Sequence, residues 1–156
     1  MAFEKAKAYL EGFGLGDKII VTEHSSATVS EAAQAIGCEE AMIAKTLSFL
    51  QEDRPVLILA DGTARIDNRK YKDRFRCKAK MIPGDQVEAL VGHAIGGVCP
   101  FGANEGVSVY LDESLRRHEI VYPAVGNDHS GIKLTIPELE KCSGFLEWVD
   151  VCKQPE

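Results

Sequence analysis

The chain has 156 residues, of which 45% are hydrophobic and 27% charged, and its formal net charge is −6. This length predicts a single domain over residues 1–156, with a core that buries roughly two-thirds of the unfolded surface. No apolar run approaches the ~20 residues of a membrane span, and the first residues lack the apolar core of a signal peptide. These features argue against membrane contact, and we expect a cytoplasmic protein.

The five cysteines are odd in number, widely spaced and without a C-x-x-C pair. Reduced thiols in the cytosol fit this pattern better than a disulfide framework or a zinc site. The four histidines likewise show no spacing typical of metal ligands. We therefore predict no metal and no bound cofactor.

Helices and strands are expected to mix along the chain without strict alternation, because helix caps and period-two runs follow one another irregularly. Helices are expected over residues 2–13, 28–36, 67–75, 85–91, 112–117 and from 135 onward. Strands are expected over residues 18–22, 42–50, 56–60, 77–82, 107–111, 120–125, 132–135 and around 149–151. Residues 51–55 are expected to form a polar turn. The class is α/β in the broad sense, with a mixed sheet.

A lysine stands on the apolar side of one expected strand. Residues 42–50 alternate, and with a period of two Lys45 shares its side with Ile43, Leu47 and Phe49. A core-facing ammonium is unfavourable unless a partner compensates for its burial. Lys45 therefore either extends to the edge of the strand or projects into a polar pocket, where it would suit a phosphate, a carboxylate or a carbonyl oxygen.

A glycine-rich loop follows about fifty residues later. The sequence Gly96-Gly97-Val98-Cys99-Pro100-Phe101-Gly102 cannot form a regular helix or a central strand. Such a loop exposes backbone N–H groups that can bind a phosphate, a carbonyl oxygen or a developing oxyanion. A plain turn between two elements is the alternative.

A basic segment interrupts an otherwise acidic chain. Residues 65–80 hold eight basic and two acidic side chains, a net charge of +6, which leaves −12 for the rest. Such a patch can bind phosphates locally, and the interleaved Tyr71 and Phe75 could stack or pack. Candidate nucleic-acid contacts are Arg69, Lys70, Lys72 and Arg74, with a solvated helix face as the alternative.

Several motifs follow one another in a characteristic order over about residues 20–140. They are His24, Thr28 with Glu31-Ala32-Ala33 and Gly37, Ile43-Ala44-Lys45-Thr46-Leu47, the loop at residues 96–102, Tyr110-Leu111-Asp112, and Gly126. In this order the chain resembles the YbaK/EbsC family, the free-standing relatives of the editing insertion domain of bacterial prolyl-tRNA synthetase. The pairing of the K-T-L strand with the G-G-x-x-P-x-G loop is the more specific part of the resemblance.

The resemblance implies a single editing-domain fold, with a mixed, mostly antiparallel sheet and surrounding helices. It also implies trans-editing, the hydrolysis of the ester that joins a wrong, small amino acid to the terminal adenosine of a tRNA, with tRNA-Pro expected. A second site of this kind is needed because a synthetase cannot reject similar-sized or smaller amino acids by more than a few kcal/mol. The partners implied are a mischarged aminoacyl-tRNA and a prolyl-tRNA synthetase, and the sequence predicts no particular oligomeric state.

In this family no protein nucleophile is thought necessary, because a ribose hydroxyl of the tRNA helps activate or position water. Lys45 would help anchor the substrate near its terminal nucleotide, and Gly96, Gly97 and Gly102 would offer amides to the aminoacyl carbonyl. A module that binds a nucleotide or a tRNA end without turnover is the alternative.

For three other positions that the resemblance covers, a role in the site and a purely structural or surface role both remain open. His24 would line the amino-acid pocket or lie on the surface, and Thr46, which points away from Lys45 by alternation, would belong to the site or serve packing. Phe101 would wall the pocket or fill the core, while Val98 and Pro100 belong to the loop itself. Pocket residues are also expected at His129 and Ser130, after the late glycine.

Cys99 stands where the family more commonly has serine. A rival hypothesis therefore makes Cys99 a nucleophile, with His93 or His129 as its base.

Overall fold

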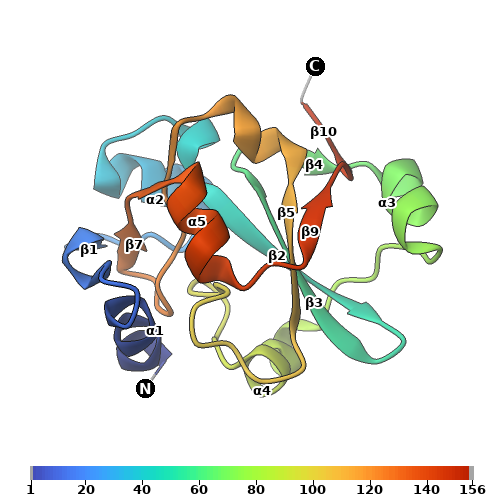
Figure 1. Ribbon diagram of the computed structural model, residues 1–156, viewed down its shortest axis with the longest axis horizontal. Coiled ribbons are helices and arrows are strands. Elements are labelled where there is room, and N and C mark those ends of the chain that lie inside the picture. The colour runs from blue at the N-terminus through green and yellow to red at the C-terminus, as the bar shows by residue number, and fades with distance from the viewer. Residues whose placement is uncertain (1, 155–156) are drawn as a thin grey trace.

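The computed structural model describes residues 2–154, and a four-stranded sheet in the order β2-β3-β5-β9 forms its centre (Figure 1). Its strands are β2 (Ala44–Gln51), β3 (Arg54–Asp61), β5 (Ser108–Asp112) and β9 (Glu147–Val149). Strands β2 and β3 form an antiparallel hairpin, whereas β5 and β9 each join the sheet in parallel. Strand β2 is therefore an edge strand and β3 a central one.

Three two-stranded antiparallel pairs surround this sheet. They are β1 (Ile19–Val21) with β7 (Ser130–Ile132), β4 (Arg65–Ile66) with β10 (Cys152–Lys153), and β6 (Ile120–Val121) with β8 (Leu134–Thr135). The expected mixed α/β class is confirmed. Within residues 2–154 four of the six strand pairings are antiparallel, although two of the three in the central sheet are parallel.

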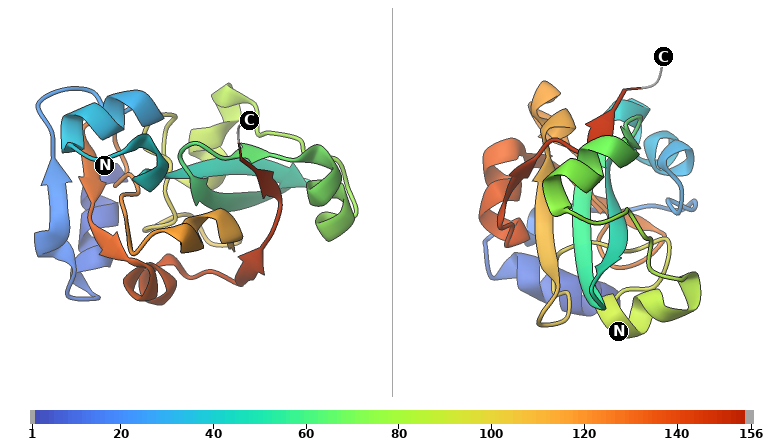
Figure 2. Two further views of the ribbon diagram at one scale, coloured as in Figure 1. Left: turned by 90° about the horizontal axis from the view of Figure 1, so that it is seen from above. Right: turned by 90° about the vertical axis from the view of Figure 1, so that its right-hand side faces the viewer.

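Five α-helices lie around the sheet, at the two ends of the molecule and against one face. They are α1 (Ala2–Glu11), α2 (Val29–Ile36), α3 (Asn68–Phe75), α4 (Val87–Val91) and α5 (Ile136–Ser143). Helix α3 lies at one end of the molecule, and α1 with β1 and β7 lies at the other (Figures 1 and 2). In residues 2–154 no helix has the length and apolar character needed to cross a membrane.

Helix caps determine where three of these helices begin. The Thr28 hydroxyl accepts the Glu31 amide at 3.1 Å, and the Asp67 carboxylate accepts two amides at the start of α3. Thr135 and Glu138 form a capping box at the start of α5. The helix starts predicted from these residues are confirmed, because a side-chain oxygen satisfies amides that the first turn leaves unpaired.

Two expectations were wrong in detail. Residues 77–82 form no strand of their own, and only Met81 bridges to Phe49 of β2. Pro55 lies inside β3 and not in the turn, because Glu52 and Asp53 both take positive φ and close the hairpin as a two-residue loop.

The two faces of the central sheet carry separate apolar clusters. Val56, Ile58 and Ala60 pack on the side of Tyr71 in α3. Leu57, Leu59 and Leu111 pack on the other side, together with buried residues of α1, α4 and α5. This alternation along β3 fixes which side each β2 side chain takes, because directly paired residues share a face.

Candidate functional site

A cavity of about 290 Å³ opens beside the free edge of β2. Its walls come from β2 and from α2 with the loop that precedes it. Further lining residues are Met81, Ile82, Gly84, Val87, Ile95, Gly96, Val98, Ser130 and those at 122–124. A hollow of this size suits one chemical group of a ligand, such as an amino-acid side chain or a sugar, and not a large surface. Two exposed apolar side chains, Met81 and Ile95, belong to its lining.

The cavity coincides with a gap in the hydrogen bonding of that edge. On one side of the gap the Ala44 amide donates to the Tyr122 carbonyl at 3.2 Å, and on the other the Ile82 amide donates to the Ser48 carbonyl at 3.1 Å. Outward-pointing backbone groups recur at every second residue of an edge strand. The N–H and C=O of Thr46 therefore point outward between these two bonds, and no backbone group of residues 2–154 pairs with them.

The side chain of Thr46 faces the same hollow. Thr46 pairs with Leu59 and Lys45 with Ala60, so the two side chains leave β2 on opposite faces, as the alternation predicts. The Thr46 hydroxyl is buried and has no hydrogen-bond partner among the described residues. With its backbone groups, Thr46 presents three polar groups at an apolar wall, which is more than packing requires.

Lys45 also lines the cavity, from the other face of β2. Its ammonium donates a hydrogen bond to the Ala64 carbonyl, in the turn that follows β3. Burial lowers the pKa of Lys45, and the neighbouring Cys152 and Asp61 oppose that shift. The ammonium is thus half-buried and held by one backbone oxygen, which leaves donors for a ligand.

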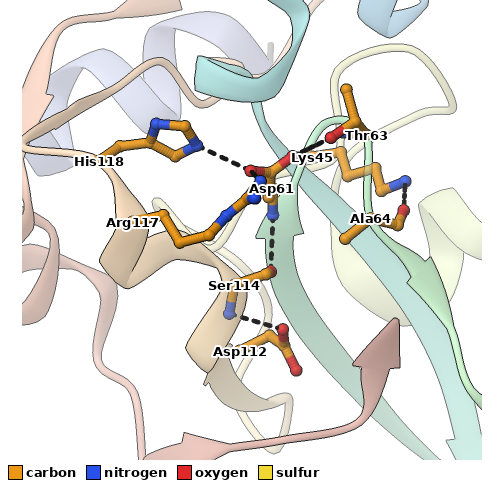
Figure 3. A network of polar contacts seen from close by, with 8 residues as sticks. All are labelled: Lys45, Asp61, Thr63, Ala64, Asp112, Ser114, Arg117 and His118. Carbon is orange, nitrogen blue, oxygen red and sulfur yellow. Dashed lines mark hydrogen bonds and ion pairs between the residues drawn. The ribbon is translucent and has the colours of Figure 1, made fainter. Parts of the chain in front are cut away.

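Asp61, which was not among the expected site residues, is a fully buried carboxylate close to this lysine (Figure 3). Arg117 and His118 contact its Oδ2, and Thr63 donates twice to its Oδ1. Burial opposes ionisation, but hydrogen bonds from His118, Arg117 and Thr63 outweigh it and hold the pKa of Asp61 below its usual value. A hydrophobic strand ending in aspartate was the only sequence feature that could have pointed to it.

The glycine loop reaches the cavity through Gly96 and Val98. Gly96 has a φ of 92°, which favours glycine. Gly97 has no room for a side chain, because a Cβ there would lie 2.4 Å from the Asn127 nitrogen. Its carbonyl accepts the Gly126 amide at 3.1 Å, so Gly97 packs two backbone segments together and does not line the hollow.

The rest of the loop lies beneath the surface. Cys99, Pro100 and Phe101 are buried outside the cavity lining, and Gly102 packs against Lys5 of α1. Phe101 thus fills the core, the second of its two readings.

The environment of Cys99 does not support a nucleophile. The thiol is fully buried, 3.5 Å from His93 Nε2, and burial raises the pKa of Cys99 to about 12. The thiolate is the reactive form of cysteine, and it is strongly disfavoured here.

The remaining expected pocket residues separate into two groups. Ser130 lines the cavity, where its amide and carbonyl both bond the hydroxyl of Ser26, a pocket residue that the sequence reading missed. His24 lies in a separate surface hollow beside α2. His129 is exposed, with its Nδ1 2.6 Å from Asp128.

The basic side chains of α3 also divide into two groups. Lys70 donates to Asp150 at 3.0 Å and to the Cys152 carbonyl at 2.9 Å, and Arg74 pairs with Glu147. Arg69 and Lys72 are exposed, and neither forms an ion pair within residues 2–154. Of these four side chains, only those of Arg69 and Lys72 are free to contact phosphates.

As for metals, the part of the chain that the structure describes contains no group of three His, Cys, Asp or Glu side chains able to hold an ion.

The fold and the cavity together define a small α/β domain with a cavity at a gapped sheet edge, flanked by a lysine and a glycine loop. The chain belongs to the aminoacyl-tRNA editing domain family, whose model matches residues 23–142.

Relatives agree with this assignment. The chain is 43% identical over the full length of both proteins to an uncharacterized protein, YwhH, from Bacillus subtilis (strain 168). Over 69% of its length it is 28% identical to a proline–tRNA ligase from Streptococcus sanguinis (strain SK36), of which it spans 17%. The crystal structure of a candidate trans-editing enzyme for prolyl tRNA synthetase superposes with a TM-score of 0.86, at 32% identity and 97% coverage of each chain.

Proposed function

We propose that this chain is a trans-editing deacylase, which hydrolyses the ester of a mischarged small amino acid on a tRNA. The observation that carries the proposal is the cavity at the edge of β2, where unpaired polar groups of Thr46 face the glycine loop in a chain of the editing family. An ester carbonyl needs amide donors and a small enclosed space, and this gap supplies both.

The reaction needs water, a polarised carbonyl and a fixed substrate. Amides at the cavity wall, from Thr46 and from Gly96 or Val98, would donate to the carbonyl oxygen as negative charge develops on it; one such donor contributes about 3 kcal/mol in other enzymes. The Lys45 ammonium would hold the terminal nucleotide. The ribose hydroxyl next to the ester would position the attacking water, so that no side chain of the protein forms a covalent intermediate.

Two further parts of the proposal concern the substrate. The cavity of about 290 Å³ has room for a small amino acid. The similarity to proline–tRNA ligases and to a candidate trans-editing structure favours tRNA-Pro, with a prolyl-tRNA synthetase as partner.

We also propose that Arg69 and Lys72 contact tRNA phosphates, because α3 leaves these two cations unpaired. Replacing both with alanine should weaken tRNA binding and reduce the slope of log affinity against log salt by about 1 to 2. The matched control is Lys7→Ala with Lys141→Ala, exposed lysines on other helices, which should leave the slope unchanged. An unchanged slope in the α3 variant would remove this surface from the proposal.

The direct test is a deacylation time course with tRNAs charged with alanine, cysteine, serine, threonine and proline. The wild-type protein is compared with Lys45→Ala and with Lys133→Ala, an exposed lysine outside the cavity. We expect rapid loss of one or two amino acids, greatly slowed by Lys45→Ala and unaffected by Lys133→Ala. Equal rates in wild type and Lys45→Ala would make the site assignment wrong.

A binding module without turnover is the alternative that this experiment separates. It predicts that the charged tRNA binds, that binding depends on Lys45, and that no ester of the panel is cleaved by the folded protein.

A further inference from the structure

Asp61 has a more elaborate environment than a turn residue needs. Its carboxylate is fully buried at the end of β3 and receives contacts from Thr63, Arg117 and His118 (Figure 3). Thr63 donates its amide and its hydroxyl to Oδ1, both at 2.7 Å, while His118 Nε2 lies 2.7 Å from Oδ2. A buried carboxylate is stable only when its oxygens are satisfied in this way.

The backbone around Asp61 is held as firmly as its side chain. Its carbonyl accepts the Ala64 amide at 3.0 Å, and its own amide donates to the Ser114 hydroxyl at 3.1 Å. Gly62 lies so close to a neighbouring segment that a Cβ there would be 2.1 Å from the Glu40 carbonyl oxygen. The turn from 61 to 64 is therefore fixed from several directions.

This fixed turn determines the position of one carbonyl oxygen. The Ala64 carbonyl accepts the hydrogen bond from the Lys45 ammonium. Lys45 stands beside Asp61 across the hairpin, since Lys45 pairs with Ala60. Any movement of the turn would move the group that orients the lysine.

We propose that Asp61 is a positioning residue for Lys45: its carboxylate holds the 61–64 turn so that the Ala64 carbonyl fixes the ammonium at the cavity wall. This inference rests on the proposed function, in which Lys45 holds the terminal nucleotide of the substrate. Asp61 touches no substrate itself and acts through the turn. Its negative charge, close to Lys45, also favours the charged lysine.

A carboxylate on another element serves as the control. Glu138 of α5 accepts the Thr135 amide at 2.9 Å and pairs with Lys18 at 3.0 Å, and it does not line the cavity. Glu138→Gln is therefore the matched control for Asp61→Asn. The buried Asp112 does not suit this purpose, because its partner Ser114 also bonds the Asp61 amide.

A double-mutant cycle tests the proposal. Deacylation is measured for wild type, Asp61→Asn, Lys45→Ala and the double variant, with Glu138→Gln in parallel. Losing one charge-assisted contact to the substrate corresponds to about tenfold in kcat/KM, so we expect that loss from Asp61→Asn alone. In the Lys45→Ala background the same substitution should change the rate by less than about twofold, because the group it positions is gone. Equal losses in both backgrounds would overturn the proposal.

A second readout is independent of catalysis. In protein labelled with 13C at lysine Cε, the Lys45 resonance is assigned by its loss in Lys45→Ala. Asp61→Asn should shift and sharpen this resonance, because the ammonium is released from Ala64, whereas Glu138→Gln should leave it in place. An unmoved resonance in Asp61→Asn would refute the positioning role, whatever the activity.

The two readouts separate the failure of this inference from the failure of the proposed function. If the wild-type protein cleaves no ester of the panel while Asp61→Asn still shifts the resonance, the proposed function is wrong and the positioning holds. If Lys45→Ala deacylates normally, the role of Lys45 in the site is wrong. If Asp61→Asn does not fold, Thr63→Val serves in its place. This variant keeps the carboxylate and removes one of its hydroxyl donors, and it should move the Lys45 resonance in the same direction by a smaller amount.

Discussion

Replacing Thr46 with valine should make the protein more stable and less active at once. The hydroxyl of Thr46 is buried without a partner, and valine keeps the volume while removing the polar atom. An unsatisfied buried polar group costs about 1–3 kcal/mol, so we expect the free energy of unfolding to rise by about 1 kcal/mol. For a chain of this length that corresponds to a rise in Tm of about 3 °C.

The same substitution should slow deacylation by about tenfold, because the substrate loses one hydrogen bond of about 1.4 kcal/mol while the Thr46 backbone groups remain. Thermal unfolding and single-turnover deacylation of one preparation measure both effects. Thr135→Val is the control, since its hydroxyl caps α5 away from the cavity, and it should lower stability by about 1 kcal/mol without changing the reaction. If Thr46→Val destabilises the protein, or leaves its activity unchanged, the argument from an orphaned hydroxyl is wrong.

Three further predictions concern the loop and the core beneath it. Cys99→Ser should keep deacylation within about twofold of wild type in initial-rate assays, because a thiol with a pKa of about 12 forms no nucleophile; a loss of a hundredfold would restore the thiol hypothesis. Burial lowers the pKa of His93 below 6.5, so the unfolded chain takes up a proton that the folded chain does not. Stability in urea should therefore decline as the pH falls below about 6.5, and less steeply in His93→Gln. Gly97→Ala should lower the free energy of unfolding by more than about 2 kcal/mol, because the added Cβ would meet the Asn127 nitrogen. The control Gly106→Ala has a positive φ but open space around it, and it should lower the free energy of unfolding by about 1 kcal/mol. Equal losses in urea unfolding would refute the close-approach argument.

Local features of the fold were predictable because their causes are local. The caps at Thr28, Asp67 and Thr135 each lie within three residues of the amides they accept. The alternation of residues 42–50 alone predicted the face of β2 from which the Lys45 side chain projects, and the pairing of Lys45 with Ala60 confirms it. Long-range pairing was not predictable: nothing in a three-residue run such as β9 specifies that it joins β5 in parallel.

The same difference between local and long-range causes decides which residues of the candidate site were predictable. Sequence reasoning led to Lys45 and Gly96, because an ammonium on an apolar face and a glycine loop are unusual in themselves. It could not separate Gly96, which lines the cavity, from Cys99, which lies beneath it, since burial within a loop depends on what packs against it. Asp61 was missed because two of its partners, Arg117 and His118, lie more than fifty residues away, at the end of a 3-10 helix over Glu113–Arg117 and directly after it.

The gap in the edge of β2 has a consequence for how the protein behaves in a crowded solution. An exposed sheet edge invites pairing with another chain and hence aggregation. Here Tyr122 on one side and Ile82 on the other already occupy the edge, so that only the short stretch from the Ala44 carbonyl to the Ser48 amide, centred on Thr46, remains open among the described residues. So short a free stretch admits a small ligand but gives a foreign strand few backbone partners, and the occupied remainder of this edge thus limits association through β2.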